Sequence, residues 1–255
     1  MTIARDQLFV EFDGCRFEYE DLPGDPALAP LLFLHEGLGS VGLWRGFHHQ
    51  VATASGRRTL AYSRLGHGLS DPPPQPREIS FMHDEAATVL PALLERWGVH
   101  KPVLVSHSDG ASIALLHAAT HPVSGVVAMA PHVFVEDISI QGIETARDAY
   151  RDGNLRRRMS RHHRDPDVTF WGWNDVWLDP EFRSWNIVAT LGTIRCPMLL
   201  VQGEDDQYGS LAQLDAIERA VPGEVRREVL ACGHSPHLES PEPTLRAIAD
   251  FLETR

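Results

Sequence analysis

This sequence could do chemistry where an apolar stretch is interrupted by polar residues. The stretch covers residues 102–114 (PVLVSHSDGASIA). A chain that passes from a buried strand directly into a helix turns within about two residues, and only where the flanking side chains are small. Ser106 and Gly110 meet that demand on either side of Ser108. Ser108 would then adopt a strained backbone conformation with its hydroxyl exposed at the sheet edge. It is therefore a candidate nucleophile, and its alternative role is that of a helix N-cap.

A serine hydroxyl is a weak nucleophile at neutral pH and needs a base to take its proton as it attacks. His234 follows a predicted strand, and the adjacent Asp205 and Asp206 follow another. A histidine titrates near neutral pH, and a carboxylate can orient its ring and stabilise the cation that forms. The alternative for His234 is a loop histidine with purely local hydrogen bonds.

The elements expected around these residues alternate between strands and helices. Apolar runs predict strands over 8–12, 16–19, 30–34, 58–62, 123–129, 197–201 and 225–230, with one more from Pro102. Helical spacing predicts helices over 43–51, 82–97, 211–220 and 242–252, with one more after Gly110. Asp13-Gly14 predicts a hairpin turn between the first two strands. This alternation indicates the α/β class, with a mostly parallel sheet covered by helices on both faces.

The pattern changes between residues 133 and 187, where strand-like runs stop. We expect an inserted helical cap there, and a core made of residues 1–132 and 188–255. The cap should contain a helix over 137–151 and a basic turn over 155–158. Its tryptophans either line a pocket or pack the cap onto the core; they are Trp171, Trp173, Trp177 and Trp185.

Composition limits the classes of partner. A formal net charge of −12 over 255 residues argues against nucleic acid and anionic membrane surfaces. No apolar run approaches the ~20 residues that span a bilayer. Residues 1–6 contain no stretch of signal-peptide type, and three widely spaced cysteines favour reduced thiols. We expect a cytoplasmic protein whose partner is a small-molecule substrate.

Five sequence blocks resemble the α/β-hydrolase superfamily, and the likeness extends over essentially the whole chain. The blocks are HEGLGS at 35–40, RLGHGLSD at 64–71, SHSDG at 106–110, GEDD at 203–206 and GHSP at 233–236. The resemblance implies the α/β-hydrolase fold with an inserted cap. It also implies a catalytic triad in the order Ser, Asp, His.

The resemblance assigns roles to individual residues. Ser108 would be the nucleophile and His234 the base. The orienting acid in this family usually stands three places after the glycine that ends its strand, here Gly203, which selects Asp206 over Asp205.

The family binds the oxyanion with backbone N–H groups, which here would belong to Gly37 and Asp109. Relatives commonly have glycine where this chain has Glu36. A carboxylate there would oppose the developing negative charge unless it points away, is protonated or pairs with a cation. We expect a polar, acidic pocket that favours a small polar or partly cationic substrate. The further residues expected to bind substrate are Glu36, His132, Glu136, Trp171 and Trp173.

The remaining histidines fit structural roles better than catalytic ones. We expect His35, His67 and His107 to hold loops by hydrogen bonds. His117 and His121 have the spacing of a zinc pair, but the glutamate of that motif is absent between them. No metal site is therefore predicted.

The function that follows is a serine hydrolase that cleaves a small carboxylic ester through an acyl-enzyme, without metal or organic cofactor. The same triad also serves thioesters, lactones, amides and carbon–carbon bonds of diketone type. A slow-turnover ligand-binding protein and a cofactor-independent oxygenase or perhydrolase, both of the same fold, are also compatible with these residues.

Overall fold

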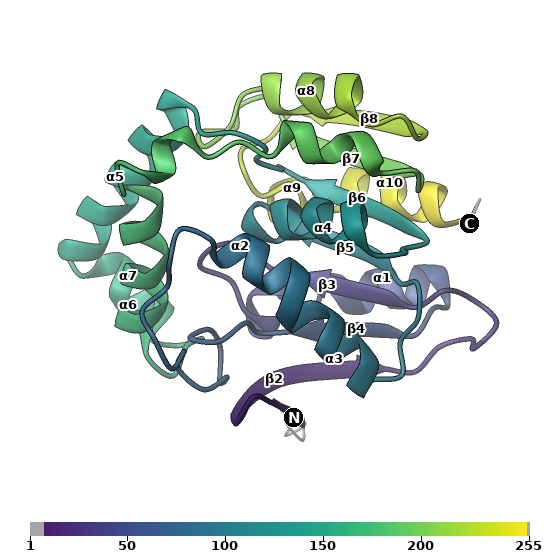
Figure 1. Cartoon of the computed structure of the whole chain (residues 1–255), viewed down its shortest axis with the longest axis horizontal. Coiled ribbons are helices and arrows are strands. Elements are labelled where there is room, and N and C mark those ends of the chain that lie inside the picture. Colours follow the sequence, from purple (N-terminus) through teal and green to yellow (C-terminus); the bar gives the residue numbers. More distant parts are fainter. Residues whose placement is uncertain (1–7, 254–255) are drawn as a thin grey trace.

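The structure, a computed structural model of the chain, describes residues 8–253. The expectation about a signal peptide rests on residues 1–6, which lie outside the described part. Among the described residues, eight strands form one sheet in the order β1-β2-β4-β3-β5-β6-β7-β8 (Figure 1). The strands are β1 (Leu8–Phe12), β2 (Cys15–Leu22), β3 (Leu31–Leu34), β4 (Thr59–Tyr62), β5 (Val103–His107), β6 (Gly125–Met129), β7 (Met198–Gly203) and β8 (Val225–Leu230).

The sheet is antiparallel at one edge and parallel elsewhere. β1 and β2 form the predicted hairpin, and Asp13 and Gly14 turn it with φ of 51° and 73°. β2 runs antiparallel to β4, whereas β4, β3, β5, β6, β7 and β8 are parallel. This is the predicted α/β-hydrolase fold, in which the carboxyl ends of the parallel strands meet at one edge.

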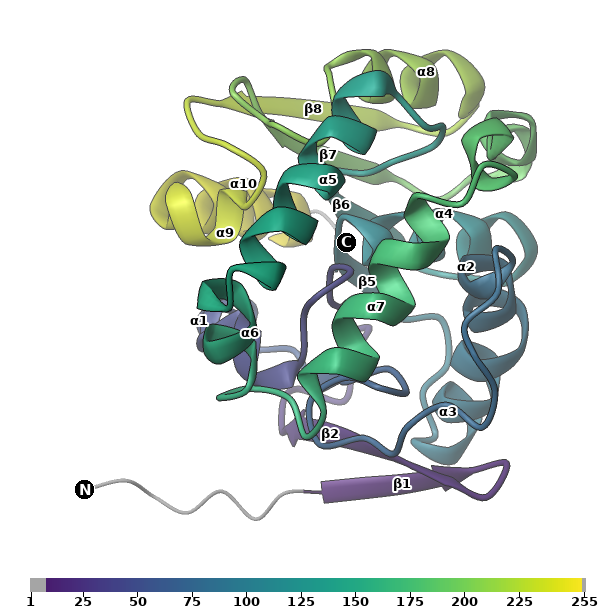
Figure 2. The same cartoon turned by 90° about the vertical axis from the view of Figure 1, so that its left-hand side faces the viewer.

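Helices cover both faces of the sheet (Figures 1 and 2). Alternate strand residues enter different cores: Leu104 packs with α2–α4 on one face, whereas Val103 and Val105 pack with α1 and α10 on the other. Within residues 8–253, none of the helices has both the length and the apolar character that crossing a membrane requires. The helical segments are η1 (Val41–Trp44), α1 (Phe47–Ser55), α2 (Phe81–Asp84), η2 (Glu85–Val89), α3 (Leu90–Arg96), α4 (Asp109–Thr120), α5 (Asp137–Arg151), α6 (Asn154–Met159), α7 (Pro166–Trp177), η3 (Phe182–Ser184), η4 (Val188–Thr193), α8 (Ala212–Ala220), α9 (Pro236–Glu239) and α10 (Pro241–Glu253).

The segment 133–187 lies at the end of the sheet, on the left in Figure 1. Figure 2 views that end directly, with α5 and α7 in front of the strand ends. The Ile187 N–H donates to the Val133 carbonyl at 2.8 Å, so the two ends of the segment are joined. The chain thus leaves the sheet and returns to it at one point, as an inserted cap would.

Two local expectations are wrong. The helix predicted over 43–51 is split into η1 and α1, because Arg45 and Gly46 take positive φ values of 49° and 84°. The basic residues 155–158 lie in helix α6 and not in a turn. Gly153, at φ of 83°, makes the turn instead, and arginine is a good helix former.

Gly110 allows α4 to lie directly against β3. A Cβ at this position would overlap the backbone carbonyls of Leu34 and His35. We expect Gly110→Ala to lower the free energy of unfolding by about 1–3 kcal/mol through overpacking. Gly192→Ala is the control, because a Cβ there meets no atom within 4 Å. Urea titrations measure both variants, and equal loss in the two would contradict the prediction.

Candidate active site

Ser108 stands between β5 and α4 with φ of 52° and ψ of −119°. This left-handed backbone is unfavourable for a residue with a side chain and is held by its neighbours. The Ser108 N–H donates to the Met129 carbonyl at 2.9 Å, and the Ser106 hydroxyl donates to the Val127 carbonyl at 2.8 Å. The strand-to-helix turn inferred from residue sizes is present.

His234 joins Ser108 to Asp206. Its Nε2 lies 2.9 Å from Ser108 Oγ, and its Nδ1 lies 2.8 Å from Asp206 Oδ1. Asp206 is buried, whereas Asp205 is exposed. The three groups form one hydrogen-bonded chain, in which a proton can pass from the hydroxyl to the imidazole while the carboxylate faces the other ring nitrogen.

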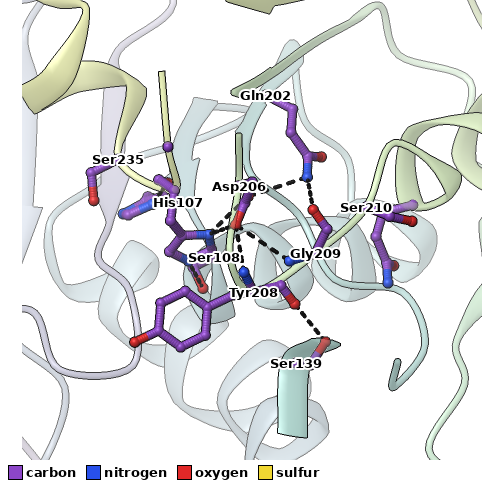
Figure 3. A network of polar contacts seen from close by, with 12 residues as sticks. His107, Ser108, Ser139, Gln202, Asp206, Tyr208, Gly209, Ser210 and Ser235 are labelled. Atoms are coloured by element: carbon purple, nitrogen blue, oxygen red, sulfur yellow. Dashed lines mark hydrogen bonds and ion pairs between the residues drawn. The ribbon is translucent and has the colours of Figure 1, made fainter. Parts of the chain in front are cut away.

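Donors surround the Asp206 carboxylate on its other sides (Figure 3). The Tyr208 and Gly209 N–H groups donate to Oδ1 at 2.8 and 3.3 Å, and Gln202 Nε2 donates to Oδ2 at 3.2 Å. Burial favours the neutral acid, but the hydrogen bond and charge of His234 outweigh it and lower the pKa of Asp206. Asp206 is therefore ionised at neutral pH and fixed in orientation.

His132 is a second imidazole beside the triad. Its ring centroid lies 5.8 Å from that of His234 and 5.3 Å from that of Trp177. Burial, reinforced by His234, lowers the pKa of His132 to about 3. The ring is neutral at neutral pH and adds no positive charge next to His234.

The expected oxyanion donors lie on two elements that meet at Ser108. Asp109 begins α4, where the first N–H groups of a helix have no partner within it. Gly37 lies in the loop of residues 35–39, here called the oxyanion loop, and a Cβ on it would overlap the Trp173 indole. Gly37 is thus required by the close approach of the cap.

The Asp109 carboxyl is buried beside this loop. Its Oδ1 accepts a hydrogen bond from Trp177 Nε1 at 3.2 Å. Burial raises the pKa of Asp109, although the nearby Arg64 and Arg77 oppose that shift. The raised pKa reduces the cost of placing this acid near an oxyanion.

Glu36 faces His107. The distance from Glu36 Oε2 to His107 Nδ1 is 3.6 Å. Burial alone would raise the pKa of Glu36, but His107 outweighs it and the pKa falls to about 2. The other nitrogen of His107, Nε2, lies 2.8 Å from the His234 carbonyl and donates to it. The Glu36 carboxylate is therefore directed towards the His107 ring.

A cavity of about 300 Å³ opens above Ser108. Of the expected substrate-binding residues, Glu36, His132 and Trp173 line it. Tyr208 was missed by sequence reasoning, although its place two residues after Asp206 was a usable signal. The other lining residues without an assigned role are Leu38, Ser139, Ile143, Arg158, Trp177, Gln207 and Ser235.

Glu136 and Trp171 are not among the residues that line this cavity. The Glu136 carboxylate accepts hydrogen bonds from the Ser210 hydroxyl at 2.6 Å and from Gln213 Nε2 at 2.7 Å. Trp171 packs against Tyr150, with ring centroids 5.6 Å apart. Residues two apart on a helix face different directions, so Trp171 and Trp173 cannot both face the cavity.

The loop roles expected of three histidines are confirmed. His35 and His67 contact the carbonyls of Glu36 and Gly37, and His107 contacts that of His234. His117 Nδ1 contacts the Ala86 carbonyl at 2.9 Å, so this ring serves a backbone contact.

One group of potential metal ligands occurs among the described residues, away from the cavity lining. His48 Nε2 and His49 Nε2 lie 2.7 and 2.9 Å from the two carboxylate oxygens of Glu20. These contacts join α1 to β2.

Comparison with known proteins places this chain in a family. The model of the "Alpha/beta hydrolase family" matches residues 31–247. The chain belongs to the alpha/beta hydrolase family. This hydrolase is 24% identical to the proline iminopeptidase of Lactobacillus delbrueckii subsp. bulgaricus over an alignment of 267 positions that covers 88% of this chain and 90% of that protein.

Two further known proteins are similar to this chain. The hydrolase is 27% identical to the 2-(acetamidomethylene)succinate hydrolase of Mesorhizobium japonicum over 221 residues, covering 76% of this chain and 78% of that protein. It superimposes on the enol-lactonase of Burkholderia xenovorans LB400 with a TM-score of 0.76 at 16% identity, covering 96% and 100% of the two chains.

The lowered pKa of Asp206 predicts a pH-dependent contribution to stability. A carboxylate whose pKa is lower in the folded state stabilises the fold above its unfolded pKa, about 4, and loses this as pH falls through the folded pKa. We expect wild type to exceed Asp206→Asn in stability at pH 7 and the difference to shrink towards pH 3. Urea unfolding at both pH values measures it. Asp205→Asn, at the exposed neighbour, should match wild type, and a pH-independent difference for Asp206→Asn would contradict the prediction.

Proposed function

We propose that this hydrolase cleaves a small carboxylic ester through a covalent acyl-enzyme. The observation that carries the proposal is the position of His234, hydrogen-bonded to Ser108 on one side and to Asp206 on the other. A nucleophile, a base and an orienting acid in one chain are what acyl transfer requires.

In the first half of the reaction, Ser108 Oγ attacks the ester carbonyl carbon while its proton passes to His234 Nε2. The carbonyl oxygen becomes an oxyanion, bound by the N–H groups of Gly37 and Asp109. Collapse of this intermediate breaks the ester bond, and the leaving alkoxide takes the proton from His234. The acyl group stays on Ser108.

In the second half, His234 takes a proton from water, which attacks the acyl carbon. The second oxyanion uses the same donors. Its collapse breaks the bond between the acyl carbon and Ser108 Oγ, releases the carboxylic acid and returns the proton from His234 to Ser108. Asp206 stays ionised throughout, which favours the imidazolium and fixes which ring nitrogen faces Ser108.

A small, polar substrate is part of the proposal, and the side chains that line the cavity support it. The cap side chains Trp173 and Trp177 bound it, and the ionised Glu36 and the Ser139 hydroxyl lie on its wall. A long alkyl chain would remove water from the Glu36 carboxylate there without a hydrogen bond to replace it. We also propose a cytoplasmic location, which the free thiols of the three cysteines support.

Replacing the nucleophile tests the mechanism. We expect Ser108→Ala to abolish fluorophosphonate labelling and to reduce p-nitrophenyl acetate turnover by at least about 10³-fold. Ser106→Ala is the control, because its hydroxyl is bonded to the backbone of the neighbouring strand β6. Labelling without turnover of any ester would favour a ligand-binding protein, and an unlabelled wild type would remove the triad mechanism.

Acyl-chain length tests the substrate class. We expect kcat/KM for p-nitrophenyl acetate to exceed that for the decanoate by at least about tenfold, since a cavity of about 300 Å³ with an ionised carboxylate on its wall suits a short acyl group better than a long one. A preference for long neutral chains would contradict this. Thioester, lactone, amide and diketone substrates of matched acyl size complete the panel, and a faster reaction with one of them would reassign the reaction class.

A further inference from the structure

We propose that His163, a residue of the cap, is a positioning residue that holds the oxyanion loop in its catalytic shape. The inference rests on the proposed function, because it concerns the donor that Gly37 supplies to the oxyanion. It makes docking of the cap a condition for a complete oxyanion hole.

The direction of each N–H group in the loop follows from the carbonyl of the same peptide, because the two point in opposite directions in a planar trans peptide. Arg64 donates to the His35 carbonyl through Nη1 and to the Glu36 carbonyl, at 2.8 Å, through Nη2. His35 Nδ1 also contacts the Glu36 carbonyl, at 2.7 Å. The Gly37 N–H must then point away from these donors.

The next carbonyl is held by a second histidine of the core. His67 Nε2 lies 3.0 Å from the Gly37 carbonyl, while His67 Nδ1 lies 3.0 Å from the Leu65 carbonyl and 3.4 Å from Arg77 Nη2. The His67 ring thus lies between the Gly37 and Leu65 carbonyls and connects the oxyanion loop to the loop of residues 64–71. Burial, with Arg77 next in effect, lowers the pKa of His67 well below its usual value, which favours the neutral ring.

The last carbonyl of the set, that of Leu38, is held from the cap. The Gly68 N–H donates to His163 Nδ1 at 3.0 Å, which places the ring proton on Nε2. Nε2 lies 3.0 Å from the Leu38 carbonyl and donates to it. The ring is buried, and burial lowers its pKa to about 4, so at neutral pH it has the one donor and one acceptor that this bridge uses.

The residues that flank Leu38 make the shape of the oxyanion loop depend on the contact between His163 and the Leu38 carbonyl. Leu38 lies between Gly37 and Gly39, and glycine restricts the backbone less than any other residue. Without His163, the Leu38 carbonyl and the Gly68 N–H would lose a buried partner, and the loop would rearrange to recover hydrogen bonds. Such a rearrangement would displace the Gly37 N–H from the oxyanion.

Neighbouring cap residues keep His163 in place. Arg164 donates its N–H to the Gly68 carbonyl at 2.8 Å, and its Nη1 lies 2.9 Å from Asp71 Oδ1. The Thr169 hydroxyl donates to the Gly66 carbonyl. The segment after α6 is thus fastened to the loop of residues 64–71, and the ring of His163 extends this attachment to the oxyanion loop.

The test compares His163→Phe with His163→Gln, using p-nitrophenyl acetate and an alkylboronic acid. Phenylalanine keeps the ring but has no nitrogen, whereas glutamine retains a donor and an acceptor. We expect His163→Phe to lower kcat about 10- to 100-fold with KM within about threefold, since losing one oxyanion donor outright costs about 10²–10³-fold. Affinity for the boronic acid, whose adduct with Ser108 carries an anionic oxygen, should fall in parallel. His163→Gln should recover most of both.

The control is His162→Phe at the adjacent half-buried histidine, which should keep wild-type kcat. If His163→Phe does not fold, as judged by its thermal melt, His163→Leu replaces it. Three outcomes, each with an active wild type, would overturn this inference but leave the proposed function intact. They are a folded His163 variant with unchanged kcat and boronate affinity, a loss confined to KM, and an equal loss in His162→Phe. A wild type that neither turns over ester nor binds boronate overturns the proposed function.

Discussion

The left-handed turn at Ser108, with φ of 52°, is the constraint on which the site depends. Such a conformation persists only where the surroundings compensate for its strain. Here α4 can lie against β3 because Gly110 has no side chain to meet the Leu34 carbonyl. The Ser108 N–H is held by β6 through Met129. The turn fixes the hydroxyl above the sheet edge and directs the unpaired N–H groups of α4 to the same point.

Parallel strands bring the other reactive groups to this point. Asp206 follows β7 and His234 follows β8, and these strands are neighbours in the sheet. The two residues therefore meet near Ser108, although they are 28 positions apart in the sequence. The two acids beside them differ in their electrostatics. Burial raises the pKa of Asp109, and the charge of Glu36 is directed towards His107.

Neutral histidines account for much of the order in the surrounding loops. The chain has 14 histidines, and burial lowers the pKa of His35, His67 and His163 below the usual value. A neutral imidazole donates at one nitrogen and accepts at the other, so it can join two backbone groups without introducing a buried charge. In this hydrolase these rings connect the cap, the oxyanion loop and the loop of residues 64–71.

Residue types and spacing by themselves determined the alternation of strands and helices, the hairpin at Asp13-Gly14 and the turn at Ser108. These depend on local sterics and periodicity, which adjacent residues specify. The family resemblance had already selected Asp206 over Asp205 as the partner of His234. The tertiary structure alone decided where Glu36 points and which cap tryptophans reach the cavity. Each of these depends on the direction of a side chain relative to elements distant in sequence. The bridge from His163 to Leu38 joins residues 125 positions apart, so no local pattern could have indicated it.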